Sequence, residues 1–109
     1  MLKIKGSKIM LTRGDTAQIL ITLKDSNGDN YVPQAGDVIR FAAKKNYSDE
    51  TPVIEINVPV DTLYLVINPE DTKSLPFGEY KYDIQITRAD GVIDTFIDRA
   101  EFWITEEVE

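Results

Sequence analysis

The sequence predicts an all-β fold, an immunoglobulin-like antiparallel β-sandwich of about eight strands with one short helical turn near residues 69–75. Three observations lead to this prediction. Apolar and polar residues alternate with a period of two along most of the chain, as in half-buried strands. Clusters of Gly, Pro, Asn and Asp interrupt the alternation at short intervals. A helical turn after residue 68 leads into a strand with two tyrosines, which is typical of a crossing between the two sheets.

The alternating stretches account for the strands. In the first of them, Ala17, Ile19 and Ile21 share one face, whereas Gln18 and Leu20 share the other. No segment sustains a helical apolar stripe for more than about two turns, so the prediction is all-β. In chain order the predicted strands are residues 17–24, 38–45, 53–58, 63–67, 79–88, 92–97 and 102–105.

Turn residues separate these strands. Residues 25–30 form a hairpin connection in which Asn-Gly supplies positive φ at little cost, and residues 89–91 form a second one. Residues 33–37 turn the chain before the next strand, and residues 46–52 form a loop. Residues 98–100 break the register of the last strand region, so they hold either a bulge or the end of one strand and the start of another.

The segment from residue 68 to residue 86 fixes the architecture. Asn68 can cap a helical turn, and Pro69 suits the first helical position. Pro76 ends the turn, and Gly78 permits a tight bend into the next strand. Tyr80 stands where sandwiches of this kind often have a corner tyrosine.

Composition limits the chemistry. The length predicts a single β-sandwich domain, residues 1–109. The chain has no cysteine and no histidine, which excludes thiol nucleophiles, thiolate metal sites, the commonest general base and the commonest transition-metal ligand. Asp83, Asp94 and Asp98 could pair as catalytic carboxylates, but we expect them to face solvent beside basic residues (Lys81, Arg88 and Arg99). The prediction is therefore no enzyme, no catalytic residue, no cofactor and no metal site.

Charge also limits the partners. The formal net charge is −7, so we expect no nucleic-acid binding. The one sparse basic cluster is Lys3, Lys5, Lys8 and Arg13, and residues 101–109 are acidic. These ends are either solvated or pair with each other, within one subunit or between neighbours. No signal peptide and no membrane-spanning run is visible, so we expect a chain made in the cytoplasm and no membrane partner.

Two short motifs favour turns over binding sites. Arg13-Gly14-Asp15 spells an integrin-recognition tripeptide, but it precedes a predicted strand where a turn is needed. Asp25-x-Asn27-x-Asp29 opens like a calcium loop, although Gly36 stands where an EF-hand needs a bidentate Glu. A solvated hairpin turn is the favoured interpretation, and a weak calcium site shared with Asp37 stays open as the alternative.

Aromatic residues supply the candidate contact sites. Trp103 lies on the opposite face of its strand from Phe102 and Ile104, so both faces are apolar and one of them has no obvious cover. This arrangement indicates either a subunit contact or a strand covered on both sides. Tyr31 and Tyr64 are the other candidates for an exposed aromatic surface. The predicted partner-contact residues are thus Trp103, Tyr64 and Tyr31.

Taken together, the chain resembles small all-β proteins of phage and prophage tails and baseplates in Gram-positive bacteria, most of all the N-terminal immunoglobulin-like domain of baseplate upper proteins. The residues that carry the resemblance are 11–16, 25–29, 36–45, 69–86, 91–95 and 101–104. The resemblance covers most of the chain, and turns and strands carry it.

The resemblance implies a structural assembly module that acts by protein–protein contacts. Its partners would be other tail or baseplate proteins or a homo-oligomer, and its destination would be a virion tail. Whether the chain is a free-standing adaptor, a truncated relic or one domain of a longer protein stays open. The alternative function, from a different class, is a module that binds carbohydrate or another cell-surface ligand through its aromatic residues.

Overall fold

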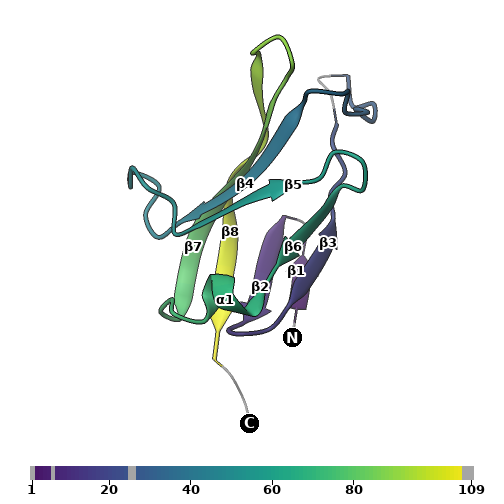
Figure 1. Ribbon diagram of the computed structural model, residues 1–109. Coiled ribbons are helices and arrows are strands. Elements are labelled where there is room, and N and C mark those ends of the chain that lie inside the picture. The colour runs from purple at the N-terminus through teal and green to yellow at the C-terminus, as the bar shows by residue number, and fades with distance from the viewer. Residues whose placement is uncertain (1, 6, 25–26, 107–109) are drawn as a thin grey trace.

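The computed structural model describes residues 2–5, 7–24 and 27–106, and it confirms the predicted all-β sandwich with one short helix. A six-stranded sheet, in the order β1-β2-β8-β7-β4-β5, faces a two-stranded sheet made of β3 and β6 (Figure 1). The elements are β1 (Leu2–Lys5), β2 (Lys8–Thr12), β3 (Ala17–Leu20), β4 (Val38–Lys44), β5 (Ile54–Val58), β6 (Tyr64–Ile67), α1 (Pro69–Thr72), β7 (Gly78–Thr87) and β8 (Ile93–Thr105).

One strand pair departs from the predicted antiparallel arrangement. β2 runs parallel to β8, with Ile9 opposite Phe102 and Leu11 opposite Ile104. The pair arises because β1 and β2 form a hairpin that attaches to the edge of the large sheet beside the last strand. The sequence prediction treated these N-terminal residues as a basic end and did not expect the hairpin. The large sheet is therefore mixed, whereas every other strand pair is antiparallel.

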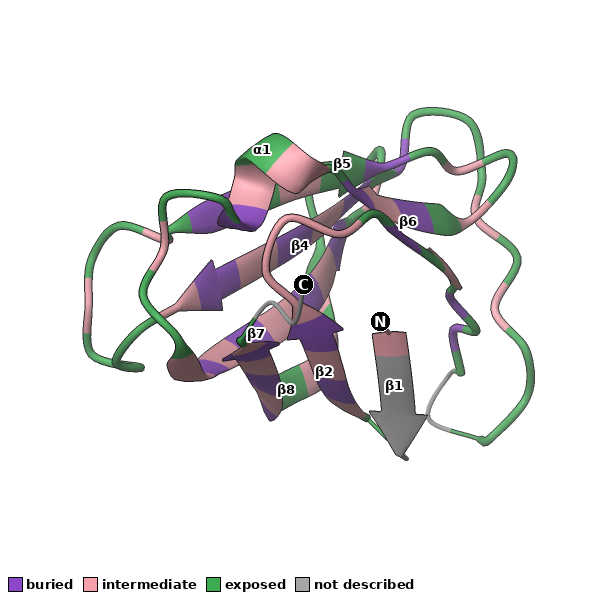
Figure 2. Cartoon of the chain, turned by 90° about the horizontal axis from the view of Figure 1, so that it is seen from below, coloured by how far each residue is buried: buried purple, intermediate pink, exposed green. Residues whose placement is uncertain are grey.

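The core follows the predicted alternation. Inward-facing residues of β4, β7 and β8 alternate with outward-facing ones (Figure 2). Phe41 meets Phe102 edge to face, with ring centroids 6.0 Å apart, and lies 5.2 Å from the ring of Tyr82. Such aromatic pairs add to the stabilisation from buried apolar area. The largest side chains with almost no exposure are Tyr80, Phe41, Phe102, Leu11, Leu23, Ile39, Leu65, Ile67, Ile86 and Ile104.

The crossing between the sheets has the predicted corner tyrosine. The Asp71 carboxylate accepts the backbone N–H of Asn68 at 2.8 Å, which fixes the start of α1. After α1 the chain bends at Gly78, where φ is +131°. The hydroxyl of Tyr80 then donates to the carbonyl oxygen of Pro76 at 2.7 Å. This hydrogen bond links the start of β7 to the segment between α1 and β7.

The register break at residues 98–100 is a bulge inside one strand. β8 continues from Ile93 to Thr105, and its pairing with β7 shifts between Tyr82 and Gln85. Arg99 adopts a left-handed conformation with φ of +54°. A bulge of this kind bends its strand, because the extra residue has no opposite partner. Of the two alternatives that the sequence left open, the bulge is correct.

The loops fall near their predicted positions. Arg88 N–H donates to the carbonyl oxygen of Val92 at 2.8 Å, which closes the turn between β7 and β8. Lys24 bridges to Asn30 across the first hairpin connection, in which Asp25 and Ser26 lie outside the described residues. β3 ends at Leu20, although the prediction extended that strand to residue 24.

In the described ranges, α1 is the only helix, and no helix there is long and apolar enough to cross a membrane.

Candidate interaction surface

Two grooves lie on either side of residues 20–22, where the chain leaves β3. The outer groove has a volume of about 370 Å³ and is built by residues from 20–23, 30–33 and 60–63. The inter-sheet groove has a volume of about 330 Å³ and lies between β3 and the inner face of the large sheet. Both grooves are mainly apolar, and Leu20, Ile21 and Thr22 line both of them.

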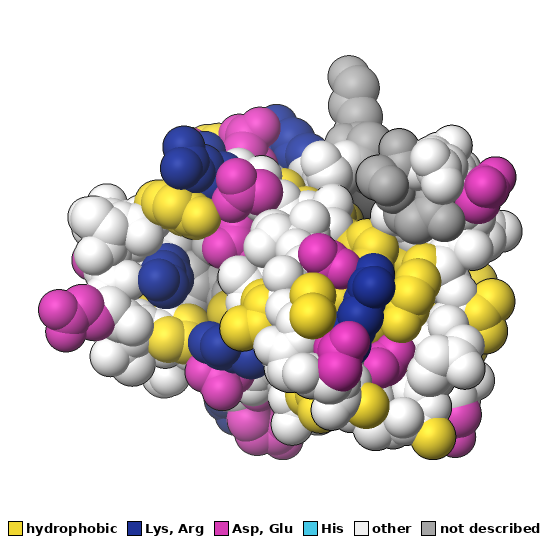
Figure 3. Space-filling model, turned by 90° about the horizontal axis from the view of Figure 1, so that it is seen from above, with side chains coloured by type: hydrophobic (Ala, Val, Ile, Leu, Met, Phe, Trp, Pro, Cys, Tyr) yellow, Lys and Arg dark blue, Asp and Glu magenta, His cyan; other side chains and the backbone are white. Residues whose placement is uncertain are grey.

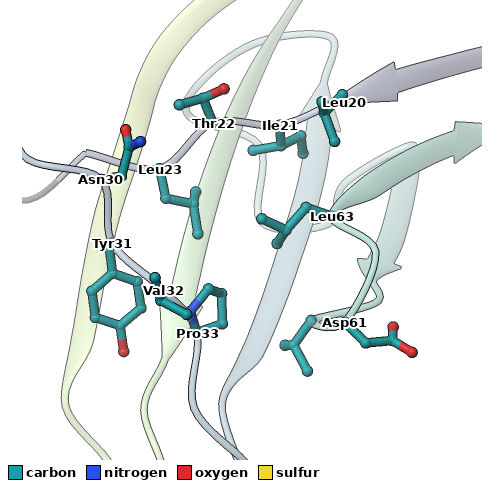
Figure 4. A pocket seen from close by; sticks show the side chains of 11 residues that line it. Leu20, Ile21, Thr22, Leu23, Asn30, Tyr31, Val32, Pro33, Asp61 and Leu63 are labelled. Atoms are coloured by element: carbon teal, nitrogen blue, oxygen red, sulfur yellow. The ribbon is translucent and has the colours of Figure 1, made fainter.

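An unusual backbone conformation shapes the outer groove. Leu63 has φ of +60°, which is rare for a bulky residue. Its N–H donates to the carbonyl oxygen of Pro59 at 2.9 Å, and its own carbonyl oxygen accepts the N–H of Ile21 at 2.9 Å. In Figure 4 the side chains of Ile21, Leu23 and Leu63 lie toward the groove, whereas the Asp61 carboxylate points away from it. The groove wall is therefore apolar.

Three exposed apolar side chains lie in or next to the grooves: Leu20 lines both, Val32 lines the outer one, and Tyr64 is paired with Leu20. Val32 is 69% exposed, Leu20 is 59% exposed and Tyr64 is 42% exposed. Leu20 lies directly opposite Tyr64 in the β3–β6 pair, so both side chains stand on the outer face of the small sheet. Large apolar side chains gathered beside a concave surface are typical of a protein–protein interface. We call Leu20, Val32 and Tyr64 the apolar rim.

Tyr31 lines the outer groove, but its hydroxyl already donates a hydrogen bond within the chain. The hydroxyl donates to Asp37 Oδ2 at 2.7 Å, and the Arg88 guanidinium lies 4.9 Å from the centre of its ring. The hydrogen bond to Asp37 raises the pKa of Tyr31 above its usual value. The N–H of Gln34 and the Tyr31 hydroxyl both lower the pKa of Asp37. Tyr31 thus anchors residues 31–37 to the end of β7, and only part of its ring faces the groove.

Trp103 lies elsewhere, on the outer face of the large sheet. Its indole N–H donates to Glu101 at 3.1 Å, and the Lys8 ammonium lies 5.5 Å from the centre of its ring. Glu79, on the neighbouring strand, pairs with Lys81, which lowers the pKa of the Glu79 carboxyl. Local charged side chains therefore cover part of Trp103. Lys8 also lowers the pKa of Glu79, so this one residue of the basic cluster lies near an acidic residue of the large sheet.

The structure gives both short motifs structural roles. Gly14 N–H donates to the hydroxyl of the buried Thr72 at 2.9 Å, and the Arg13 guanidinium lies 4.1 Å from the centre of the Phe77 ring. The Arg-Gly-Asp tripeptide is therefore a turn packed against the segment around α1. In the calcium alternative, Asp37 would be a ligand, but its two oxygens already accept three hydrogen bonds. Within residues 2–5, 7–24 and 27–106, no cluster of three or more potential ligand side chains forms.

The three strand carboxylates do not gather into one site. Asp94 pairs with Arg88 at 2.7 Å, and Asp98 accepts the Tyr47 hydroxyl at 2.9 Å while lying 3.8 Å from Arg99. Asp83 accepts the backbone N–H of Arg99 at 2.8 Å. The pairing of two of them with Arg88 and Arg99 agrees with the sequence prediction. Lys81 differs, because it pairs with Glu79.

No family model, curated protein or solved structure matches this chain. The structure brings part of Tyr31 to the outer groove, places Tyr64 opposite Leu20 in the small sheet, and places Trp103 on the other sheet. The prediction missed Leu20 and Val32. Leu20 carried a detectable signal, because it is an apolar residue at an outward-facing position of the alternation, whereas Val32 carried none.

The charges on the molecular surface are mixed. On the face shown in Figure 3, apolar side chains lie close to both basic and acidic ones, and side chains of the two signs are interspersed. The net charge of −7 is therefore not gathered into one acidic patch on that face. An interface there would depend on apolar contact and shape more than on electrostatic attraction.

Proposed function

We propose that this chain is a non-enzymatic assembly module that acts by protein–protein contacts, with further copies of itself among its partners. The observation that carries the proposal is the apolar rim beside two grooves. An exposed rim of this kind loses unfavourable contact with water when a partner covers it. The net negative charge limits unspecific association at the same time.

A phage or prophage tail or baseplate is the setting that the sequence resemblance implies, and that setting stays a prediction. Other tail or baseplate proteins are accordingly proposed as partners. A β-sandwich with a corner tyrosine is compatible with this role, since such modules can expose strand edges and loops to neighbours. Many unrelated proteins share the architecture, so the fold alone does not select this setting.

The mass of the chain in solution, measured by light scattering across a dilution series, tests the proposal. We expect an oligomer that dissociates on dilution, and we expect Val32→Asp to shift the midpoint to higher concentration. Val92→Asp is the matched control, because Val92 is also an exposed valine but lies in the β7–β8 turn. A monomer at every concentration would contradict self-assembly, and equal effects of the two variants would contradict the assignment of the surface.

A ligand-binding module is the second candidate, and the outer groove favours it. Its volume of about 370 Å³ lies within the range of roughly 300–1,000 Å³ that small-molecule sites occupy. Thr22 and Asn30 are polar residues of its lining. Titration with neutral oligosaccharides, with and without calcium, should then shift the amide resonances of Asn30 and Leu63. Unchanged resonances would rule out carbohydrate binding in this groove.

A further inference from the structure

The free edge of β3 is the feature that extends the proposal. Within the part of the chain that the structure describes, β3 pairs with β6 alone. The N–H of Ile21 donates to the carbonyl oxygen of Leu63, so the backbone N–H and C=O of Ile21 point toward β6. In an antiparallel ladder, backbone groups of successive residues point alternately to the partner strand and away from it. The N–H and C=O groups of Gln18, Leu20 and Thr22 therefore point to the open side.

The other sheet edges carry features that discourage pairing, and β3 does not. β1 contains Lys3 and Lys5, and β5 contains Glu55 and ends just before Pro59. Charges and proline are the usual means by which proteins protect a strand edge. Residues 17–22 read A-Q-I-L-I-T, with no charge, no proline and no glycine. The remaining edge, on β6, packs against β5. β3 is thus the edge that best accepts an uncharged strand.

We propose that this strand is β3 of a second copy of the chain, paired antiparallel across a twofold axis with Leu20 opposite Leu20. The strand is self-complementary in this register, because Gln18 then faces Thr22 and both copies present the same outward-pointing groups. The two small sheets would join into one, and the side chains would form the row Tyr64, Leu20, Leu20, Tyr64 on its outer face. Leu20, which is 59% exposed in one copy, would pack against its counterpart at the centre of this row and lose part of its exposure.

The uncharged β3 edge and the closed twofold contact suit a second copy. Each copy has a net charge of −7, so two copies repel each other at long range, but β3 brings no charged residue to the contact and adds no local repulsion. Added salt should strengthen the dimer, because it screens the remaining repulsion. A twofold contact uses the same edge of both copies and closes after two, so the pairing does not propagate into fibres.

The inference rests on the proposed function, because it names the surface through which two copies meet. Amide hydrogen exchange on the unmodified chain is the first test. The Leu20 amide should exchange more slowly at concentrations where the dimer forms. The Ile21 amide already bonds to Leu63 and should change little. Protection that does not depend on concentration at Leu20 would overturn the inference. This measurement needs no variant and no disturbance of folding.

Disulfide trapping gives the second test. The chain has no cysteine, so Leu20→Cys introduces a single thiol. Directly opposed residues of a hydrogen-bonded pair have Cα atoms about 5.5 Å apart, which suits a disulfide. With oxidised glutathione as oxidant, two thiols of two copies should join and release two molecules of reduced glutathione. Ile93→Cys is the matched control, because Ile93 is 61% exposed and lies at the far end of β8.

We expect Leu20→Cys to cross-link much faster than Ile93→Cys. We also expect Leu20→Lys to weaken dimerisation by roughly tenfold or more, because the substitution places two like charges opposite each other. If the chain forms an oligomer but both cysteine variants cross-link equally slowly, the β3 pairing is wrong and the proposed function stands. If the chain is monomeric at every concentration, self-assembly and the β3 pairing both fail. The two failures are therefore distinguishable.

Discussion

Asp83 of β7 accepts the backbone N–H of Arg99 at 2.8 Å, so a carboxylate on one strand holds the bulge of its neighbour in place. Arg99 is one of two described residues other than glycine with positive φ. Such a conformation costs free energy, and surrounding contacts must stabilise it. The bulge bends β8 near its middle, between the turn that faces residues 31–37 and the segment that pairs with β2.

Asp83→Ala should destabilise the chain by about 1 kcal/mol, because the Arg99 N–H loses its acceptor. Asp83→Asn keeps an oxygen acceptor at the same place and should lose less. The free energy of unfolding from urea titrations provides the measurement. Equal losses in the two variants would show that the hydrogen bond does not stabilise the bulge.

Tyr80→Phe should destabilise the fold by about 1–3 kcal/mol, because it leaves the Pro76 carbonyl oxygen in a partly buried place without its donor. Tyr64→Phe serves as the control, since Tyr64 is exposed and lies on the small sheet. Urea unfolding midpoints, compared at unchanged slope, measure the difference. A loss for Tyr80→Phe no larger than that for Tyr64→Phe would contradict a stabilising role for the corner.

Gly36→Ala should destabilise the chain more than Gly28→Ala. Both glycines have positive φ, so each alanine carries a backbone cost of about 1–2 kcal/mol. At Gly36 the added Cβ would also lie 2.9 Å from Cβ of Ala89, whereas Gly28 has open space around it. Thermal unfolding of both variants measures the difference. Ala89→Gly should restore part of the loss at Gly36, and no restoration would argue against the clash.

Acid should remove a stabilising contribution from Asp37. The N–H of Gln34 and the hydroxyl of Tyr31 lower the pKa of Asp37 below its ordinary value of 3.8. A carboxyl whose pKa is lower in the folded state stabilises the fold above its unfolded pKa, and this contribution disappears as pH falls through the folded pKa. Wild-type stability should therefore fall more steeply below pH 4 than that of Asp37→Asn. Parallel pH curves for the two proteins would contradict this assignment.

The candidate surface was only partly predictable from the sequence. Tyr64 was predicted as a contact residue, and the structure places it in the apolar rim, exposed and opposite Leu20. Trp103 was predicted on the ground that its strand lacked cover, but Lys8 and Glu101 provide part of that cover. A side chain from a distant segment supplies one of those contacts, so the local pattern could not reveal it.

The all-β class, most strand positions, the helical turn and the corner tyrosine could be predicted from local sequence patterns. These features depend on the period of apolar residues and on turn chemistry, which are set by residues close together in the chain. The parallel β2–β8 pair, the left-handed Leu63 and the grooves beside β3 became visible only in the folded chain. Each of these depends on which distant segments meet. Local periodicity gives a strand its two faces, but sheet order decides which edge stays open.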